Sequence, residues 1–452
     1  MGITIIGLGP GDPSLLTCEA KELLEKAKEV YLRTKRHPAV DSLPHHLQLH
    51  SFDHLYEKVE TFEEIYERIA QEILHLGERP EGVLYAVPGH PLVGEASVHR
   101  LLALAQEKGV PVSIVAGMSF LEPVFSLLGV DPLAGLQIGD AVTLASRLHP
   151  GFNPDTPVLI GQLYSRTVAA DLKLTLMNLY PDDHPVTLIQ GAGIHEAKTR
   201  TIPLYELDHE KEIDHLTSLF IPPLSAPSSL SSLQDIVARL RAPDGCPWDR
   251  EQTPKSLRPF LLEETYEALE ALDLEDPERL REELGDLLLE ILLQVQIAAE
   301  GGEFKMPDVL GGIIAKLIRR HPHVFGEEEA TTPGEVISRW QEIKREEGQL
   351  AEGPFADLPL TMPALARAQR IQQVAPARGL TVEMDEAELL ARVKKRFEVL
   401  SQFGGEEAEE MWGTLLFDLV ALANLKGIDA ESALRKAVRD FEKGASASVI
   451  TT

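Results

Sequence analysis

The feature that most constrains this 452-residue chain is a change of pattern at the Pro/Ser-rich segment IPPLSAPSSLSS, residues 221–232. Before this segment, short β-rich runs alternate with amphipathic helical stretches. After it, helical periodicity takes over and runs of β-branched residues become rare. Clusters of proline and serine are typical of linkers. The pattern therefore predicts a multidomain protein with an α/β domain (1–222), a linker (223–232) and a helical half, and the length allows about three domains.

The α/β half contains five short runs that are strand candidates. Three amphipathic stretches, at residues 18–28, 62–76 and 97–108, are helix candidates between them. This alternation predicts a largely parallel sheet covered by helices. The strand candidates are ITIIGLG, GVLYAV, PVSIVAG, PVLIGQL and PVTLIQG.

The helical half is divided again by a second break, GQLAEGPFADLPLTMP at residues 348–363. The segments on either side, 233–347 and 364–446, have the pattern of a repeat, because their apolar positions coincide when they are aligned. Each segment is expected to form an all-α unit built around a helical hairpin. The aligned stretches are LEETYEAL (262–269) with VKKRFEVL (393–400), and GDLLLEIL (285–292) with GTLLFDLV (413–420).

The first of these hairpins has a predictable turn. Asp276-Pro277 is typical of an N-cap followed by proline at the first helical position, so a helix is expected from there to about Ala299. The preceding helix is expected over roughly residues 259–272, which places the centre of the turn near residue 275. In an antiparallel hairpin, residues equidistant from the turn face each other.

Four carboxylates are equidistant in pairs from this turn. Glu267 and Glu283 lie eight residues on either side of it, and Glu264 and Asp286 lie eleven. Within each helix the i, i+3 spacing places both side chains on one face. Converging carboxylates repel one another unless a cation lies among them, and hard oxygen ligands select Mg²⁺ or Mn²⁺. The sequence therefore predicts a divalent cation site between the two helices.

The residues around Asp286 favour this interpretation over a charged outer face, which we expect for Glu270 and Glu282. Asp286 directly precedes three leucines, and such a run predicts a deeply buried helix. A carboxylate in apolar surroundings costs on the order of several kcal/mol unless it is paired or bound to a cation. Gly285 leaves room beside Asp286 for another helix or a ligand.

Several separated segments of this region, in order, resemble the MazG-type nucleoside triphosphate pyrophosphohydrolases over residues 233–347. They are GCPWDREQTPKSLRPFLLEETYEALEA, REELGDLL and LIRRHPHVFG. The resemblance implies an α-helical, Mg²⁺-dependent, usually dimeric enzyme that splits NTPs or dNTPs into monophosphate and pyrophosphate. It also implies site residues: Glu264, Glu267, Glu283 and Asp286 as metal ligands, and Glu263 as the residue that orients the attacking water.

A very acidic protein also needs local cations to bind a triphosphate. Lys316 and Arg320 are one helical turn apart and are the favoured triphosphate contacts, with Lys344 further along the chain. The alternative for each is a solvated surface charge. Trp248 and Trp340 are candidates for stacking on a base, with core packing as the equal alternative. His321 and His323 flank Pro322 and are expected to order the turn rather than to bind metal.

The second repeat departs from the acidic pattern. Lys395 aligns with Glu264, Met411 with Glu283 and Thr414 with Asp286, whereas Glu398 keeps the carboxylate of Glu267. A single carboxylate with a lysine in place of a ligand is not expected to hold Mg²⁺. We therefore expect residues 364–446 to pack or dimerise without catalysing.

The amino-terminal domain begins with a glycine-rich loop, TIIGLGPGDP, directly after a strand candidate. Glycine there allows close backbone approach to a ligand at the end of a sheet, although a plain turn has the same pattern. With YAVPGHPLVGEAS, IVAGMSFLEPVFSLLGVDPL and GQLYSR, this loop resembles the tetrapyrrole methylases across residues 1–220. The resemblance implies two α/β subdomains that bind S-adenosylmethionine in a cleft, with contacts near Pro10, Gly89, His90, Ser119, Phe120 and Leu163.

One departure from the methylase pattern concerns the cofactor loop. Gly89-His90-Pro91 stands where that family has Gly-Asp-Pro, and the lost carboxylate either weakens cofactor binding or marks a changed role. The order of the domains resembles methylase–MazG fusion proteins. Three hypotheses follow: a pyrophosphohydrolase joined to a methyltransferase, a methyltransferase whose helical half is a dimerisation module, and a hydrolase regulated by a non-catalytic amino-terminal scaffold.

Charge and composition limit the partners. The net charge of −29 repels DNA and anionic membranes, so neither a nucleic-acid polymer nor a membrane is expected to bind. Two cysteines offer no disulfide framework or zinc site, and no signal peptide or 18-residue apolar segment is present, so we expect a cytoplasmic protein. The expected partners are nucleoside triphosphates, a methyl acceptor that the sequence does not identify, and a second copy of the chain in a homodimer.

Overall fold

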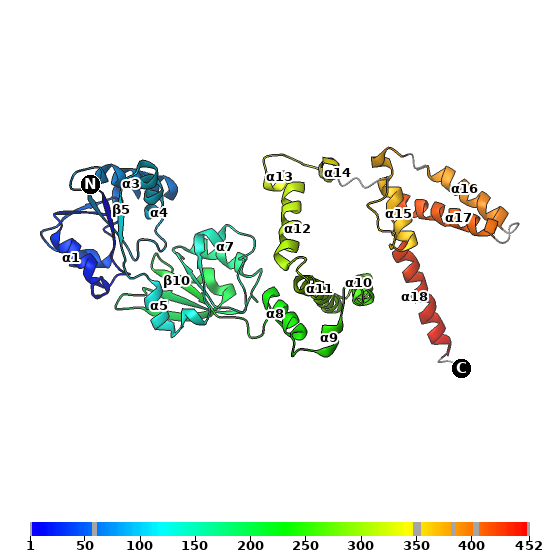
Figure 1. Cartoon of the computed structure of the whole chain (residues 1–452), viewed down its shortest axis with the longest axis horizontal. Helices are drawn as coiled ribbons and strands as arrows, with labels where there is room; N and C mark the ends of the chain where they lie inside the picture. The colour runs from blue at the N-terminus through cyan, green and yellow to red at the C-terminus, as the bar shows by residue number, and fades with distance from the viewer. Residues whose placement is uncertain (1, 57–60, 347–353, 381–384, 401–405, 450–452) are drawn as a thin grey trace. The chain divides into compact units, whose positions relative to one another are not determined.

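The computed structural model describes residues 2–56, 61–346, 354–380, 385–400 and 406–449 (Figure 1). It divides the chain into two compact units, Met1–Ile236 and Val237–Thr452, which are called here the N-terminal and the C-terminal unit.

The first part of the N-terminal unit is a parallel five-stranded sheet in the order β3-β2-β4-β1-β5. Strand β1 pairs with the central strand β4 on one side, Ile3 opposite Val83, and with the edge strand β5 on the other. Glycine-containing loops follow the carboxyl ends of β1, β4 and β5, which is where open α/β sheets bind ligands. The strands are β1 (Ile3–Gly7), β2 (Glu29–Leu32), β3 (Gln48–Ser51), β4 (Val83–Val87) and β5 (Val112–Val115).

Helices cover both faces of this sheet, as its buried side chains require. Ile5 and Tyr85 pack in one core cluster with residues of α3 and α4, and Ile6 and Ala86 pack in another with residues of α1. Figure 1 shows these helices beside the sheet. The inner strands β1 and β4 are therefore buried on both sides, which is typical of parallel sheets. The helices are α1 (Cys18–Lys26), α2 (Asp53–Tyr56), α3 (Phe62–Gly77) and α4 (Ala96–Lys108), with 3-10 turns η1 (Pro13–Leu15) and η2 (Pro38–Ser42).

The second part of the N-terminal unit is a mixed sheet in the order β6-β7-β10-β8-β9. Only β6 and β7 pair in parallel, and the other pairs are antiparallel. The expectation of one largely parallel sheet is therefore wrong for this half of the domain. The elements are α5 (Leu121–Leu128), η3 (Pro132–Ala134), β6 (Gln137–Asp140), α6 (Ala141–Ala145), β7 (Val158–Gly161), α7 (Arg166–Leu176), β8 (Pro185–Gln190), β9 (Lys198–Pro203), η4 (Leu204–His209) and β10 (Thr217–Ile221).

The predicted linker begins as part of this unit. Asp155 accepts hydrogen bonds from the backbone N–H groups of Ser228 (2.7 Å) and Ser229 (3.1 Å) and from the hydroxyl of Ser232. The serine hydrogen bonds lower the pKa of Asp155 to about 2. Helix α8 (Leu230–Arg241) starts inside the predicted linker, so the serines form a capped helix start rather than a free spacer. The predicted domain boundaries remain predictions.

The C-terminal unit contains the predicted acidic hairpin, formed by α10 (Arg258–Asp273) and α11 (Pro277–Glu300). Asp276 is the N-cap of α11 and accepts from two backbone N–H groups, with Pro277 at the first helical position. Glu275 closes the turn with a φ of 54°. The predicted helix bounds and turn centre are thus confirmed to within about one residue. The other helices of this region are α9 (Pro247–Glu251), α12 (Met306–Arg320), α13 (Pro322–Phe325) and α14 (Pro333–Glu346).

The last part of the C-terminal unit contains a second hairpin, α16 (Glu386–Leu400) and α17 (Glu406–Leu425), against which α15 (Ala364–Val374) and α18 (Ala430–Val449) pack. Two buried glutamines of α15 form hydrogen bonds to α17 and to the loop after it. Gln372 donates to the Phe417 carbonyl (2.8 Å), and Gln369 donates to the Ile428 carbonyl (2.8 Å). Pro376–Arg378 forms the 3-10 turn η5.

No single helix among the described residues is long and apolar enough to cross a membrane. One bent pair, Glu407–Leu425 with Ala430–Glu442, meets the length and composition requirements together, with 104° between its helices.

Candidate functional site

Three carboxylates meet between α10 and α11. Glu264 and Glu267 lie one turn apart on α10, and Glu283 lies opposite them on α11, with one oxygen of each within 4.8 Å of the others. Glu283 is buried, with 7% of its surface exposed, and the two α10 residues are partly exposed. Three carboxylates on two helices form a donor set suited to a hard divalent cation.

The three carboxylates Glu264, Glu267 and Glu283, called here the trio, repel one another electrostatically. Burial raises the pKa of Glu264, and the negative charges of Asp286, Glu267 and Glu283 raise it further. Burial also raises the pKa of Glu267, with a further increase from Glu283 and Glu263. A bound cation would reverse this repulsion, because it favours the ionised form of each carboxylate.

Arg279 is the one internal cation that contacts the trio among the described residues. Its Nε lies 3.2 Å from Glu283 Oε1 and its Nη2 lies 2.6 Å from Glu270 Oε2. Glu283 therefore has one oxygen turned toward Arg279, whereas no ion pair to Glu264 or Glu267 is found in the part of the hairpin that the structure describes. Glu270 is held on the outer part of the hairpin by the same arginine.

The structure corrects the expectation for Asp286. Its side chain is exposed, as are Leu284 and Leu288 around it, and continuous burial in α11 begins only at Leu292. The negative charge of Asp286 nevertheless raises the pKa of Glu264. The leucines after Asp286 predicted burial, but an apolar helix face that remains exposed in a single chain has the same sequence pattern.

In the N-terminal unit, three glycines bring the ends of β1, β4 and β5 together. A Cβ atom on Gly7 would lie 2.3 Å from the Gly89 carbonyl oxygen, and one on Gly117 would lie 2.4 Å from the same atom. Gly9 and Gly89 form a bridge in which the Gly89 N–H donates to the Gly9 carbonyl (2.8 Å). Only glycine fits such an approach, so a ligand at this edge would meet backbone rather than side chains.

The residues predicted to contact a cofactor surround this edge. Pro10 packs against Gly193 of the second subdomain, and Phe120 lies against Gly161 at the end of β7. Ser119 is buried and donates to Glu122 (2.6 Å), and Leu163 is fully buried. His90 Nδ1 accepts from the Leu92 N–H (3.0 Å), so the histidine that replaces the usual aspartate caps its own loop.

Residues missed by the sequence analysis lie at the same sheet edge. Arg33, after β2, pairs with the buried Glu95 (2.8 Å) and donates to the Tyr56 hydroxyl (2.9 Å). His37 is buried near the Gly9 backbone, and burial lowers its pKa to about 4. Neither residue belongs to a recognisable sequence motif. Arg33 could have been predicted as a site residue because it is a charged residue directly after a buried parallel strand.

Both regions of the chain match known families. Residues 2–208 match the Tetrapyrrole (Corrin/Porphyrin) Methylases, and residues 252–325 match the MazG nucleotide pyrophosphohydrolase domain. The protein named "Uncharacterized protein YabN" from Bacillus subtilis (strain 168) is 41% identical over 382 residues, which cover 82% of this chain and 76% of that protein. The chain belongs to the tetrapyrrole methylase–MazG fusion family.

Two named relatives match the helical half of this fusion protein. The Thermotoga maritima protein named "Nucleoside triphosphate pyrophosphohydrolase/pyrophosphatase MazG" is 41% identical over 211 residues, covering 46% of this chain and 81% of the relative. The Escherichia coli (strain K12) "Nucleoside triphosphate pyrophosphohydrolase" is 42% identical over 228 residues, covering 48% of this chain and 85% of the relative.

The basic and aromatic residues of the MazG region are placed as follows. Arg320 is 5% exposed and its guanidinium stacks over the Trp340 ring at 5.5 Å, which joins α12 to α14. Lys316 is partly exposed. Trp248 is 51% exposed and meets Phe260, near the start of α10, edge to face with ring centroids 5.7 Å apart. Lys344 lies in α14, and its side chain is outside the described residues.

The degenerate repeat of the fusion protein has no counterpart of the trio among the residues that the structure describes. Lys395, Glu398 and Thr414 are all exposed on α16 and α17, and Met411 is partly buried. The single retained carboxylate, Glu398, belongs to no cluster of three or more potential metal ligands among the described residues.

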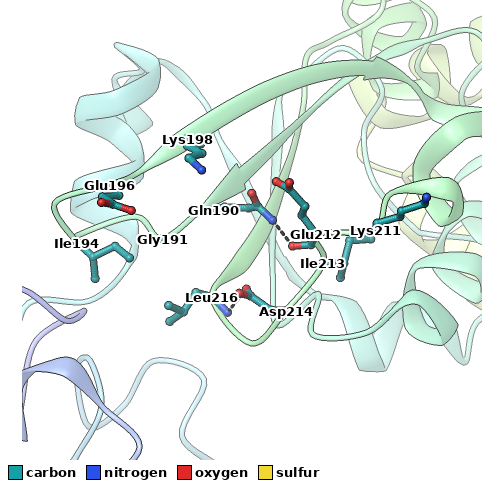
Figure 2. A pocket seen from close by; sticks show the side chains of 10 residues that line it. All are labelled: Gln190, Gly191, Ile194, Glu196, Lys198, Lys211, Glu212, Ile213, Asp214 and Leu216. Carbon is teal, nitrogen blue, oxygen red and sulfur yellow. Dashed lines mark hydrogen bonds between the residues drawn. The ribbon is translucent and has the colours of Figure 1, made fainter.

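A pocket of about 360 Å³ lies in the second subdomain of the methylase-like domain (Figure 2). Gln190, at the end of β8, donates to the Glu212 carbonyl across it, and Lys198 and Lys211 stand near its rim with Glu196 (Figure 2). Its lining of mixed charge gives no single ligand class, and the sequence analysis selected none of these residues.

Proposed function

We propose that the acidic hairpin hydrolyses nucleoside triphosphates to monophosphates and pyrophosphate with a divalent cation, Mg²⁺ or Mn²⁺. The observation that carries this proposal is the approach of Glu264, Glu267 and Glu283 to within 4.8 Å of one another. Asp286 completes the ligand set from the solvent side of α11. The named relatives support the same reaction, because both carry pyrophosphohydrolase in their names.

The chemistry of the reaction requires such a cluster. Water attacks the α-phosphorus while negative charge accumulates on the triphosphate oxygens, and bound cations activate the water and neutralise this charge. The residues of the chain hold the cations and orient the nucleophile. Glu263 is exposed next to Glu264 and Glu267, whose pKa values its charge raises, so it is placed to accept a proton from a water at the cluster.

Lys316 and Trp248 are the proposed nucleotide contacts that the structure leaves accessible. Lys316 offers a partly exposed ammonium for the triphosphate, and Trp248 offers an exposed ring for the base. The Arg320 guanidinium stacks on the Trp340 ring, so we propose that this pair orders α12 against α14. Arg320 can then contact a triphosphate only when this stack opens.

The hydrolase proposal is tested by pyrophosphate release from mixed NTPs and dNTPs with Mg²⁺. The variant Glu267→Gln removes one charge from the trio, and Glu282→Gln removes the same charge from an exposed site on α11 as a matched control. We expect release by the wild type and the control, and a loss of at least 100-fold in the trio variant. Equal release by all three proteins, or none by the wild type, contradicts the proposal.

For the methylase-like domain we propose S-adenosylmethionine binding at the edge formed by Gly7, Gly89 and Gly117. The close backbone approach of these glycines supports it. Calorimetry with S-adenosylhomocysteine tests it, and the absence of heat at millimolar ligand contradicts it. If the domain is instead a regulatory scaffold, removing residues 1–222 changes nucleotide turnover without loss of a methyl-transfer step.

We also propose that the protein is a homodimer that covers the apolar face of the MazG region. Six large apolar side chains recur on one face of α12, between 38 and 53% exposed, and Leu284 and Leu288 are exposed beside Asp286. An exposed apolar helix face such as that of α12 marks an interaction surface. A second copy would bury it and would bring Asp286 into the apolar surroundings that its sequence indicates. The α12 residues are Val309, Leu310, Ile313, Ile314, Leu317 and Ile318.

A further inference from the structure

A fifth carboxylate, Glu290, lies inside the acidic hairpin and has no role in the proposed ligand set. It is 7% exposed, and its Oε2 is buried without a hydrogen-bond partner among the residues that the structure describes. Burial raises the pKa of Glu290, and the negative charge of Glu264 raises it further. A buried and unpaired carboxylate oxygen is costly, which calls for a partner that is not part of the chain.

The second repeat shows how the same position is satisfied when no metal is bound. Asp418 aligns with Glu290 and is equally buried, but it is fully paired. Arg392 donates to both of its oxygens (2.9 and 3.1 Å), and Arg396 donates to it as well. Arg396 also donates to the carbonyl of Thr414 (2.9 Å), the residue aligned with Asp286. The Arg396 guanidinium therefore links the counterpart of Glu290 to the backbone at the counterpart of Asp286.

The first hairpin lacks both of these arginines. Leu261 aligns with Arg392 and Thr265 aligns with Arg396. The Thr265 hydroxyl is already used, because it donates to the Leu261 carbonyl of its own helix (2.7 Å). The buried carboxylate is thus retained in both repeats, and the internal cations that neutralise it are present only in the repeat without the acidic trio.

We propose that Glu290 is a fifth ligand of the acidic site and holds a divalent cation together with Asp286 and Glu264. Glu283, Asp286 and Glu290 are spaced i, i+3 and i+7 on α11, so their side chains lie on one face, and Glu264 of α10 meets that face at Glu283. Glu264 then stands between two cation positions, one with Glu267 and Glu283 and one with Asp286 and Glu290. The inference rests on the proposed function, since it assigns a further residue to the same site.

Manganese binding by the full chain tests this assignment without relying on activity. Free Mn²⁺ is followed by its electron paramagnetic resonance signal during titration of the wild type, Glu290→Gln and the control Glu282→Gln. We expect the Glu290 variant to bind one Mn²⁺ fewer, or to bind it at least tenfold more weakly, while the control matches the wild type. The metal-free Glu290 variant should melt no lower than the wild type, because the substitution removes a buried charge that has no partner.

The outcomes separate this inference from the hydrolase proposal. Wild-type Mn²⁺ affinity and stoichiometry in Glu290→Gln refute the fifth ligand and leave the trio intact. A wild type that binds no Mn²⁺ refutes both. If the Glu290 variant does not fold, Thr265→Arg decides, because it places a guanidinium where Arg396 stands in the second repeat. That variant should lose the same Mn²⁺, and unchanged binding in it contradicts the inference.

Discussion

Replacing Gly117 by alanine should disrupt the proposed cofactor edge of the methylase-like domain. The added Cβ atom would lie 2.4 Å from the Gly89 carbonyl oxygen and 2.8 Å from the Gly7 Cα, whereas ordinary contacts begin near 3.4 Å. Both neighbours are backbone atoms, so the loops after β1 and β4 must retreat by about 1 Å. Overpacking of this kind costs about 1–3 kcal/mol, and we expect the upper end because no flexible side chain can absorb the clash.

The assay combines thermal unfolding with calorimetric binding of S-adenosylhomocysteine. A loss of about 3 kcal/mol lowers the midpoint of the N-terminal unit by roughly 6–12 °C. We expect binding to weaken at least tenfold, because the backbone that would meet the ligand is displaced.

The control for this substitution is Gly109→Ala. Unlike Gly117, Gly109 has a positive φ, 67°, and a Cβ there meets nothing within 4 Å, so alanine adds backbone strain without a clash. It should cost about 1–2 kcal/mol of backbone strain and leave binding unchanged. If Gly117→Ala binds and melts like the wild type, the close backbone approach is not what forms this edge.

Three further predictions concern other parts of the chain. Burial lowers the pKa of His37 to about 4, so between pH 6.5 and 4 the unfolded chain binds a proton that the folded chain does not. The free energy of unfolding is therefore highest above pH 6.5 and falls by on the order of 3 kcal/mol toward pH 4. Urea unfolding of His37→Gln should depend less steeply on pH. Leu317→Glu on the exposed face of α12 should convert the proposed dimer to a monomer in light scattering, and an unchanged mass counts against that interface. Asp418→Asn should cost about 2–3 kcal/mol in denaturant unfolding, since it weakens the hydrogen bonds of partly exposed arginines such as Arg392, and should leave pyrophosphate release unaltered.

The acidic hairpin was the most predictable part of the fold because its signals are local. The Asp276-Pro277 cap sets the start of α11, and counting from the turn is enough to bring Glu264, Glu267 and Glu283 together. The five strand candidates of the N-terminal half are all strands, since each has a dense run of apolar and β-branched residues.

Five strands, β2, β3, β6, β9 and β10, were not among the sequence candidates. Strands β3, β6 and β9 lie at the edges of their sheets, and the polar β3 and β9 carry no apolar run. Strands β2 and β10 are buried inside their sheets, so their short apolar runs were a local signal that was not used. The antiparallel arrangement of the second sheet arises from how β10 inserts between β7 and β8, which no single strand encodes. Such pairings follow from long-range packing.

The site was harder to predict where burial decides the role of a residue. Asp286 has the sequence context of a buried residue, yet it is exposed in the chain, because the leucines beside it form an uncovered face. Arg320 has the spacing of a triphosphate contact with Lys316 but is buried against an aromatic ring. Glu290 escaped notice because a glutamate in a glutamate-rich helix is ordinary until its alignment with Asp418 and its burial are both known.

The central claim, that the carboxylates of the hairpin hold divalent cations, is tested most directly by anomalous diffraction from a crystal soaked with Mn²⁺. The account predicts a peak about 2.0–2.4 Å from oxygens of Glu264, Glu267 and Glu283, with a second peak toward Asp286 and Glu290. A crystal in millimolar Mn²⁺ with no peak between α10 and α11, or with peaks only elsewhere on the chain, contradicts it.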